Sequence, residues 1–315
     1  MTFPRLDAAD TRAALPYPAL VAALRRGFAE GATVPARHVH EIGDGGTLLI
    51  MPAWRAGQRL GVKTVAIVAA NARIDLPVLH STYLLFDALT GAPLAMLDGD
   101  EITTRRTAAV AALAASFLAR ADARRLVVVG AGRVAAQIVP ALRAVRPIDQ
   151  VSVWSRRPES AEQLASHWRG EGIDAIATSD LPAAVARADI VSCATLATAP
   201  LVRGAWLQPG CHLDLIGAFT PAMREADAEC FARATVFVDT DEALTKAGDV
   251  LDAIGAGSFS AATLQATLAD LCAGRAEGRR DDMQVTLFKS VGTALADLAA
   301  AELAFDASKT AGVVA

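Results

Sequence analysis

The hydrophobic positions of the chain follow two different patterns. From Tyr17 to Glu30, apolar residues recur at helical spacing opposite Arg25 and Arg26, which predicts an amphipathic helix. The next stretch instead contains short β-rich runs separated by Gly, Pro, Asn and Asp turns, at 47–52, 61–69, 81–88 and 93–97. Because no long helix separates these strands, we expect them to pair mostly antiparallel, in a sheet or an open barrel. Gly91, between the last two runs, indicates a hairpin turn with a positive φ.

The second part of the chain alternates strands with helices. An Ala- and Leu-rich helix, capped by Asp100 or Thr103 and running to Arg120, is expected to link the two parts. Beyond it, strands are expected at 126–129, 150–154, 174–177, 189–193, 212–216 and 235–238, with helices between them. This alternation predicts a parallel sheet with right-handed crossovers. A last helix is expected at 283–304, packed back on the first part.

Length and composition fit two domains of the α/β class. The 315 residues amount to about twice the usual length of a single domain. The composition is 53% hydrophobic but only 5% aromatic, which suits buried parallel strands flanked by Ala-rich helices. We therefore expect a Rossmann-type parallel-sheet domain at 121–282. An α+β open-barrel domain is expected to comprise 1–120 and 283–315.

Charge and residue content disfavour several classes of protein. The net charge of -4, with mixed signs, provides no continuous basic surface, so nucleic acid is not an expected partner. The four cysteines stand far apart, without a C-x-x-C pair or a histidine at zinc-ligand spacing, so we predict no metal site and free thiols in a reducing compartment. The first residues show no secretory signal, and charges interrupt every apolar stretch before it reaches the length of a membrane span. A cytoplasmic protein is expected.

A glycine-rich turn follows the strand predicted at 126–129. Gly130-Ala131-Gly132-Arg133-Val134-Ala135 has the G-x-G-x-x-A form of a dinucleotide fingerprint and opens an Ala-rich helix. Gly130 permits the tight turn, and Gly132 lets the backbone approach a pyrophosphate. The helix N-terminus favours the phosphate charge. We therefore predict that Gly130 to Val134 bind a nicotinamide dinucleotide.

The expected cofactor is NADP(H), with NAD(H) possible. The second strand of the predicted sheet ends in Ser155-Arg156-Arg157, where an NAD-binding protein normally has an acidic residue against the ribose 2′-hydroxyl. Ser155 can hydrogen-bond a 2′-phosphate and either arginine can clamp it, unless both arginines lie in solvent. Further cofactor contacts are expected at the carboxyl ends of later strands, at Ala194, Thr195 and Gly217.

Several motifs extend over nearly the whole chain. They are Gly61-Val62-Lys63, Asn71, Leu85-Phe86-Asp87, Thr90-Gly91, the run from Thr104 to Ala109, the glycine turn, Ala247-Gly248-Asp249 and the run from Leu287 to Gly292. Together they resemble the ornithine cyclodeaminase/μ-crystallin family. The resemblance implies a homodimer whose open-barrel domain, completed by the C-terminal helix, dimerises and holds substrate. It also implies that the cofactor and a small amino-acid-derived substrate meet between the domains.

The same resemblance implies roles for single residues. Substrate contacts are expected at Arg37, Lys63, Thr82 and Arg106, and the nicotinamide side is expected at Lys289 and Ser290. Lys63 and Arg106 are the expected catalytic pair, because the planar fork of an arginine suits a carboxylate and a lysine on an apolar strand needs an anionic partner. As structural alternatives, Lys63 can extend to the surface and Arg106 can pair within its helix. His38 or His80 is a further candidate for proton transfer.

One stretch divides the family by reaction. Ornithine cyclodeaminases have an Asp after the glycine pair and then Pro-Gly-Lys, whereas this chain has Phe219 in place of the Asp and Met223 in place of the Lys. Apolar groups cannot transfer protons. The stretch instead resembles that of ketimine reductases, with Phe219 as a wall of the substrate pocket. This resemblance implies NADPH-dependent reduction of Δ1-pyrroline-2-carboxylate to proline, or of Δ1-piperideine-2-carboxylate to pipecolate.

Other activities of the same family stay open at this point. One is an NAD-dependent cyclodeaminase that converts ornithine to proline and ammonia. Another is a non-catalytic, μ-crystallin-like protein that binds NADPH and a ligand. A third is an amino-acid dehydrogenase that acts on pyruvate and ammonia. The fold alone does not separate these functions.

Overall fold

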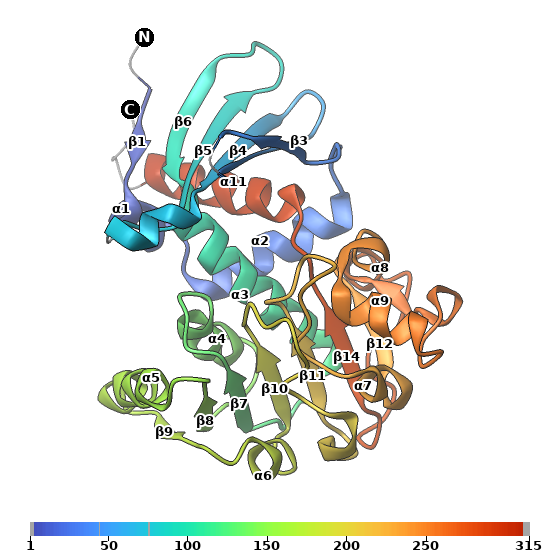
Figure 1. Ribbon diagram of the computed structural model, residues 1–315. Helices are drawn as coiled ribbons and strands as arrows, with labels where there is room; N and C mark the ends of the chain where they lie inside the picture. Colours follow the sequence, from blue (N-terminus) through green and yellow to red (C-terminus); the bar gives the residue numbers. More distant parts are fainter. Residues whose placement is uncertain (1–2, 44, 75, 311–315) are drawn as a thin grey trace. The chain divides into compact units, whose positions relative to one another are not determined.

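Two β-sheets organise the chain, one in each of two units (Figure 1). The computed structural model describes residues 3–43, 45–74 and 76–310. Met1–Arg106 and Thr293–Ala315 form the first unit, and Thr107–Gly292 form the second. The domains expected from the sequence are likewise discontinuous, and their expected boundaries are at 120/121 and 282/283. The fold class is α/β, as the sequence pattern predicts.

The first unit contains a six-stranded sheet in the order β1-β6-β5-β4-β3-β2. The strands are β1 (Arg5–Leu6), β2 (His38–Glu41), β3 (Thr47–Trp54), β4 (Arg59–Ile67), β5 (Leu79–Asp87) and β6 (Pro93–Asp98). Neighbours are antiparallel except for the parallel pair of β1 and β6, which confirms the expected pairing. The sequence pattern did not indicate β2, because all four of its residues are exposed and show no apolar alternation.

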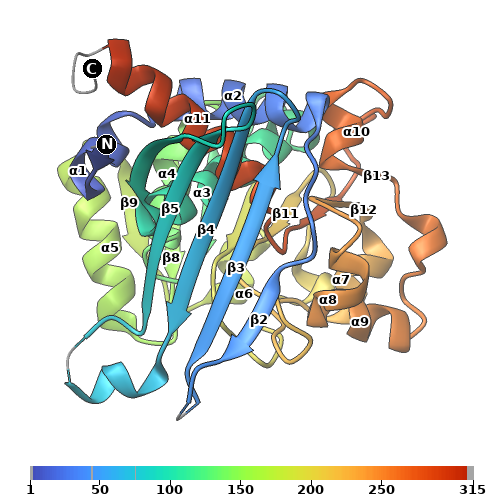
Figure 2. The ribbon, with the colours of Figure 1, turned by 90° about the horizontal axis from the view of Figure 1, so that it is seen from above.

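Helix α11 (Ala294–Thr310) covers one face of this sheet. The unit also contains α1 (Ala8–Ala13), which contacts β1 and β6, α2 (Tyr17–Glu30), and the 3-10 helix η1 (Ala69–Ile74) between β4 and β5. α11 lies against α2 and against β3, β4 and β5 (Figure 2). The amphipathic helix predicted from Tyr17 to Glu30 is confirmed, and its buried residues include Leu20, Leu24 and Phe28.

The register of β4 and β5 decides which side chains share a face. Lys63 is directly opposite Tyr83, and Thr64 is directly opposite Thr82. Opposite residues of an antiparallel pair share a face and successive residues alternate, so Lys63 and Tyr83 point to one face and Thr82 to the other. A Cβ at Gly61 would come within 1.9 Å of the Tyr83 hydroxyl oxygen, so β4 needs a glycine where this tyrosine crosses it.

The second unit contains an eight-stranded sheet in the order β13-β12-β14-β11-β10-β7-β8-β9, and every pair in it is parallel. The strands are β7 (Arg125–Val129), β8 (Gln150–Trp154), β9 (Asp174–Ala177), β10 (Ile190–Cys193), β11 (His212–Leu215), β12 (Thr235–Val238), β13 (Ala266–Thr267) and β14 (Thr286–Lys289). The predicted parallel sheet is therefore confirmed. Its inner strands β7, β10 and β11 are buried on both faces, and β7 is a continuous apolar run from Leu126 to Val129.

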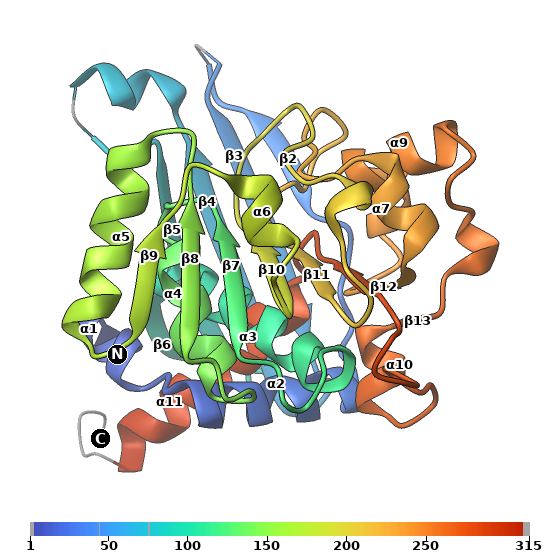
Figure 3. The same ribbon diagram turned by 90° about the horizontal axis from the view of Figure 1, so that it is seen from below.

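Helices connect these strands. They are α4 (Ala135–Arg143), α5 (Pro158–Gly170), α6 (Leu181–Val185), α7 (Ala228–Arg233), α8 (Ala243–Lys246), α9 (Gly248–Gly255) and α10 (Leu268–Cys272), with the 3-10 helices η2 (Gly204–Trp206) and η3 (Ala261–Thr263). α5 runs beside β8 and β9 (Figure 3). Among the described residues, the longest helix is α3 (Gly99–Leu118), which continues in sequence from the first unit into the second. Its first turn is capped by Asp98, whose carboxylate accepts a hydrogen bond of 2.8 Å from the Glu101 N–H, and not by Asp100 or Thr103 as expected.

The helix predicted at 283–304 is wrong in its first part. Thr286–Lys289 form β14, which lies between β11 and β12, and α11 begins only at Ala294. All four residues of β14 are buried, and a short run that is buried on both faces has the same apolar appearance in a strand and in a helix. Gly292, with a φ of 79°, marks the break between the strand and the helix.

Two further properties bear on the class of protein. In the described part of the chain, no helix has the length and apolar character that a membrane crossing requires. Cys193, Cys211, Cys230 and Cys272 are free thiols, and the first three are buried. Within the same described residues, His, Cys, Asp and Glu do not gather in any group of three or more that would suit a metal ion.

Candidate functional site

Two cations and one carboxylate meet inside the first unit. Lys63 comes from β4, Arg106 from α3 and Asp297 from α11. The Lys63 Nζ atom is 2.7 Å from Asp297 Oδ2, and Arg106 Nε donates a hydrogen bond of 2.7 Å to Asp297 Oδ1. Lys63 is 2% exposed, Arg106 6% and Asp297 0%. The sequence pattern predicted both cations as site residues, and the structure brings them together on a shared anion.

The electrostatics of this cluster leave one uncompensated positive charge. Lys63 and Arg106 contribute +2 and Asp297 contributes -1, so the sum is +1 when all three are ionised. Burial lowers the pKa of Lys63 to about 8; Asp297 opposes this effect, and the positive charges of Arg106 and Arg37 add to it. Burial alone would raise the pKa of Asp297, but Arg106 and Lys63 hold it below its ordinary value. Such a cluster is suited to a second, external carboxylate.

Other residues of the first unit differ in their relation to Lys63. The Lys63 ammonium also donates to Thr103 Oγ1 at 3.3 Å, and Arg37 acts on it through its charge. Thr82, an expected substrate contact, lies on the opposite face of the sheet from Lys63, so the two side chains do not lie together in the first unit. His80 is exposed near the start of β5, and His38 is exposed in β2.

The sequence pattern did not identify Asp297. Its carboxylate is 191 residues from Arg106 along the chain, so no local spacing connects them. One signal was present: Asp297 is an acidic residue in the run Ala294-Leu295-Ala296-Asp297-Leu298-Ala299-Ala300, which is otherwise apolar. A charged residue in such a run is either at a helix surface or paired in the interior.

The glycine turn of the second unit fits a bound dinucleotide phosphate. Gly130 has a φ of 122°, and a Cβ there would lie 2.6 Å from the Ala194 carbonyl oxygen, so only glycine fits. Gly132 is exposed, and the described residues leave open space around its Cβ position. Within the same residues, no side chain caps the start of α4. The N–H groups of Ala136 and Gln137 donate to the carbonyl oxygens of Gly132 and Val134, so a pyrophosphate at this turn would be bound by backbone N–H groups that precede Ala136.

The end of β8 has no acidic residue. Ser155 accepts a hydrogen bond of 3.1 Å from the Arg157 N–H, and its hydroxyl donates to the Arg157 carbonyl oxygen at 2.9 Å. This small turn leaves the side chains of Arg156 and Arg157 exposed beyond the strand. A pair of cations at this point suits a ribose 2′-phosphate better than a 2′-hydroxyl.

A buried glutamate joins the ends of β10 and β11. One Glu225 carboxylate oxygen accepts from the Thr195 N–H at 2.6 Å and from the Thr195 hydroxyl at 2.8 Å. The other accepts from the N–H groups of Gly217 at 2.8 Å and Ala218 at 3.1 Å. A Cβ at Gly217 would lie 2.1 Å from the Thr195 carbonyl oxygen, so the two turns are in close contact. Thr195 and Gly217, both expected cofactor contacts, are thus brought together by Glu225, which was not among the expected site residues.

The side chains of Lys289 and Ser290, in the motif from Leu287 to Gly292, are buried in the core of the second unit. Lys289 is 0% exposed, and its ammonium pairs with Asp249 at 2.7 Å. The Ser290 hydroxyl donates to Asp239 at 2.7 Å, and the same carboxylate accepts from the N–H groups that follow it. The structure therefore gives the side chains of Lys289 and Ser290 buried partners, whereas the expectation was a direct lining of the nicotinamide side. In the loop after β11, Phe219 is 36% exposed.

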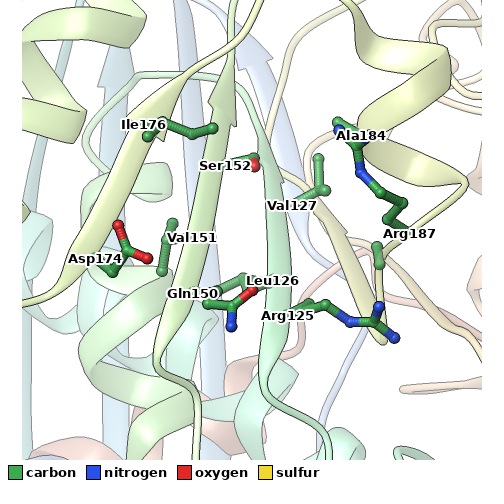
Figure 4. Close-up of a pocket in the computed structure, with 11 residues that line it drawn as sticks. Arg125, Leu126, Val127, Gln150, Val151, Ser152, Asp174, Ile176, Ala184 and Arg187 are labelled. Atoms are coloured by element: carbon green, nitrogen blue, oxygen red, sulfur yellow. The ribbon is translucent and has the colours of Figure 1, made fainter.

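A cavity of about 300 Å³ lies elsewhere in the second unit. Figure 4 shows side chains of β7, β8, β9 and α6 around it, among them Arg125, Gln150 and Asp174, the first residues of their strands. Ligands of open parallel sheets bind at the carboxyl ends of the strands, and these residues stand at the amino ends. No expected site residue lines this cavity, so it is separate from the candidate cofactor site.

Comparison with known proteins adds independent findings. A model of the ornithine cyclodeaminase/mu-crystallin family matches residues 9–312. The Delta(1)-pyrroline-2-carboxylate reductase of Paracoccus denitrificans is 42% identical over 298 residues, which cover 93% of this chain and 93% of that protein. The solved structure of Thermococcus litoralis Delta(1)-pyrroline-2-carboxylate reductase, in complex with NADH and L-proline, has a TM-score of 0.93 at 31% identity, over 99% of both chains. An archaeal alanine dehydrogenase dimer with bound NAD has a TM-score of 0.92 at 28% identity and covers 100% of this chain and 98% of that one. The chain therefore belongs to the ornithine cyclodeaminase/mu-crystallin family.

Proposed function

We propose that this protein is an NAD(P)H-dependent ketimine reductase that converts Δ1-pyrroline-2-carboxylate to proline and Δ1-piperideine-2-carboxylate to pipecolate. The observation that carries the proposal is the buried cluster of Lys63, Arg106 and Asp297, whose net positive charge suits one substrate carboxylate. Similarity to Delta(1)-pyrroline-2-carboxylate reductases over nearly the whole chain supports the same reaction class.

In this proposal the protein binds and orients, and the cofactor supplies the chemistry. A bound reduced nicotinamide supplies the hydride for the carbon–nitrogen double bond. Arg106 and Lys63 hold the substrate carboxylate, and Arg37 adds positive charge. Asp297 keeps the two cations in place when no substrate is bound, because it is hydrogen-bonded to Arg106 and ion-paired with Lys63. Gly130 to Val134 would hold the pyrophosphate, and Ala194, Thr195 and Gly217 would border the nicotinamide half.

Phe219 favours a reductase over a cyclodeaminase. A cyclodeaminase needs a proton-transfer group to release ammonia, and a phenyl ring cannot serve as an acid or a base. A reductase needs only a wall at that position, which excludes water from the imine. The partly exposed ring of Phe219 suits this second role.

The direct test follows the absorbance of the reduced nicotinamide with the five-membered and six-membered cyclic imino acids. Cofactor oxidation that depends on the imino acid is the expected result. Ammonia release from ornithine without net cofactor consumption would instead indicate a cyclodeaminase. Tight cofactor binding without turnover of either imino acid would indicate a binding protein of the crystallin type.

We further propose a preference for NADPH over NADH, supported by the exposed pair of Arg156 and Arg157 at the end of β8. Replacing both with alanine is expected to raise the Kd of NADPH by about tenfold to a hundredfold, because charge-assisted bonds to the 2′-phosphate are lost. The Kd of NADH should change little. Isothermal titration calorimetry with both cofactors checks this. Tighter NADH than NADPH binding in the unaltered protein would contradict the preference.

The alkaline limb of kcat/KM is expected near the lowered pKa of Lys63. Below a pH of about 8 the lysine is charged and can bind the substrate carboxylate; above it the charge and the interaction are lost. We therefore expect kcat/KM to fall as the pH rises through that value. Lys63→Arg should move this limb to higher pH, because a guanidinium stays charged. An alkaline limb that is identical in both proteins would assign it to another group.

We also propose a homodimer in the cytoplasm that binds a small imino-acid or amino-acid substrate. The sheet face opposite α11 carries Leu48, Ile50, Val62 and Leu84, all only partly buried in one chain. An apolar sheet face of this kind suits a second copy of the chain. The similar archaeal alanine dehydrogenase is a dimer, which supports the assignment. Sedimentation equilibrium measures the mass directly.

A further inference from the structure

We propose that Glu225 is a positioning residue that sets the affinity for the nicotinamide half of the cofactor by holding together the turns after β10 and β11. The proposal rests on the cofactor part of the proposed function. Glu225 does not contact the reacting atoms in this account. Its carboxylate acts through the backbone N–H groups of Thr195, Gly217 and Ala218, which it binds at 2.6–3.1 Å.

The order of the strands indicates which half of the cofactor these turns serve. In a Rossmann sheet the glycine turn after the first strand holds the pyrophosphate, and the end of the second strand holds the adenosine ribose. Here these strands are β7 and β8, and β10 and β11 lie on the other side of β7. The turns that follow β10 and β11 are therefore expected at the nicotinamide half. The Ala194 carbonyl oxygen lies close against Gly130, so the turn after β10 directly adjoins the pyrophosphate turn.

The backbone of Glu225 is in turn held by hydrogen bonds to Asp249. Asp249 Oδ1 accepts from the N–H groups of Glu225 at 2.6 Å and Ala226 at 3.0 Å, and Asp249 Oδ2 pairs with the Lys289 ammonium at 2.7 Å. All three ionisable side chains are at most 1% exposed. A Cβ at Gly248 would lie 2.1 Å from the Met223 carbonyl oxygen, so the start of α9 packs tightly on the loop that carries Phe219. The network thus extends from β14 and α9 to the two turns.

The position of these charges needs an explanation beyond stability. Apolar residues of similar volume commonly replace buried ion pairs without loss of stability, so a buried charged network is weak evidence for a purely stabilising role. Carboxylate oxygens, in contrast, can accept several N–H groups at once from two separate turns. Each Glu225 oxygen serves one turn, which fixes the distance between the turns.

The decisive variant is Glu225→Gln, which keeps the shape of the side chain. One carboxylate oxygen becomes an NH2 group, so at least one backbone N–H of the two turns loses its acceptor. We expect the Kd of NADH to rise by about tenfold or more. The Kd of ADP, which lacks the nicotinamide half, should stay within a factor of about two. Isothermal titration calorimetry measures both ligands on the same preparation.

The matched control is Glu229→Gln. Glu229 lies in α7, four residues after Glu225, and its carboxylate is about half exposed and pairs with Arg233. This variant should change neither Kd. Glu225→Asp keeps the charge on a shorter side chain, should give an intermediate Kd for NADH, and decides the matter if Glu225→Gln does not fold. Equal loss of NADH and ADP affinity, or no loss of either, would overturn the proposal. Unaltered protein that binds NADH but reduces no imine would overturn only the proposed function.

Discussion

Arg106→Ala is expected to lower kcat/KM for Δ1-pyrroline-2-carboxylate by about 10²- to 10³-fold. The guanidinium is almost fully buried and donates to Asp297 through Nε, and in our proposal its remaining donors hold the substrate carboxylate. The Kd of the reduced cofactor should stay within a factor of about two, because the dinucleotide turn belongs to the second unit. Steady-state kinetics together with cofactor titration measures the two effects separately.

Arg105 provides the matched control for this experiment. It is the neighbouring residue of α3, but its guanidinium donates to the Leu15 carbonyl oxygen and lies over the ring of Tyr17, 4.3 Å from the centroid. Arg105→Ala should therefore leave kcat/KM close to that of the unaltered protein at temperatures where it is folded. Equal kinetic losses in the two variants would mean that Arg106 has no specific role in substrate binding.

Asp297→Ala is expected to have the largest effect on stability. Removing this carboxylate leaves Lys63 and Arg106 buried without their shared anion, which costs about 3–5 kcal/mol of the free energy of unfolding. Activity should fall as well, because both cations lose their orientation. Urea unfolding followed by circular dichroism measures the first effect. Asp306→Ala, in the same helix at an exposed position, is the control and should change stability by less than about 1 kcal/mol.

A double variant tests the reason for this loss. When Lys63→Met accompanies Asp297→Ala, one buried charge of each sign is removed, so the double variant should be less destabilised than the sum of the single variants. Simple additivity would contradict the idea that Asp297 acts by compensating the charge of Lys63.

Local patterns in the sequence were sufficient for most of the fold. Strands β3 to β6 appear as short β-rich runs between turns without long helices, and most strands of the second unit alternate with helices, so both pairing modes could be predicted. β14 could not, because its four buried residues stand only a few positions before the apolar run of α11 and continue its apolar pattern. The glycine turn was predictable because its requirement is local: Gly130 needs a positive φ that few other residues adopt.

The site was predictable only in part, for a related reason. Lys63 and Arg106 were identifiable by residue type and by family motif, but their common partner Asp297 is brought to them by the tertiary fold. The same holds for Glu225, whose four hydrogen bonds join two turns that are distant in sequence. Lys289 illustrates the opposite case, since its motif suggested a ligand contact while the structure pairs it with Asp249 in the core.

The transfer of hydrogen from the cofactor to the ring carbon of the imino acid tests the central claim most directly. With reduced nicotinamide that carries deuterium at both C4 positions, incubation with Δ1-pyrroline-2-carboxylate should give proline labelled at C2, one label for each cofactor oxidised, as read by mass spectrometry. Unlabelled proline formed from ornithine, with ammonia and with no net oxidation of the cofactor, would contradict the account.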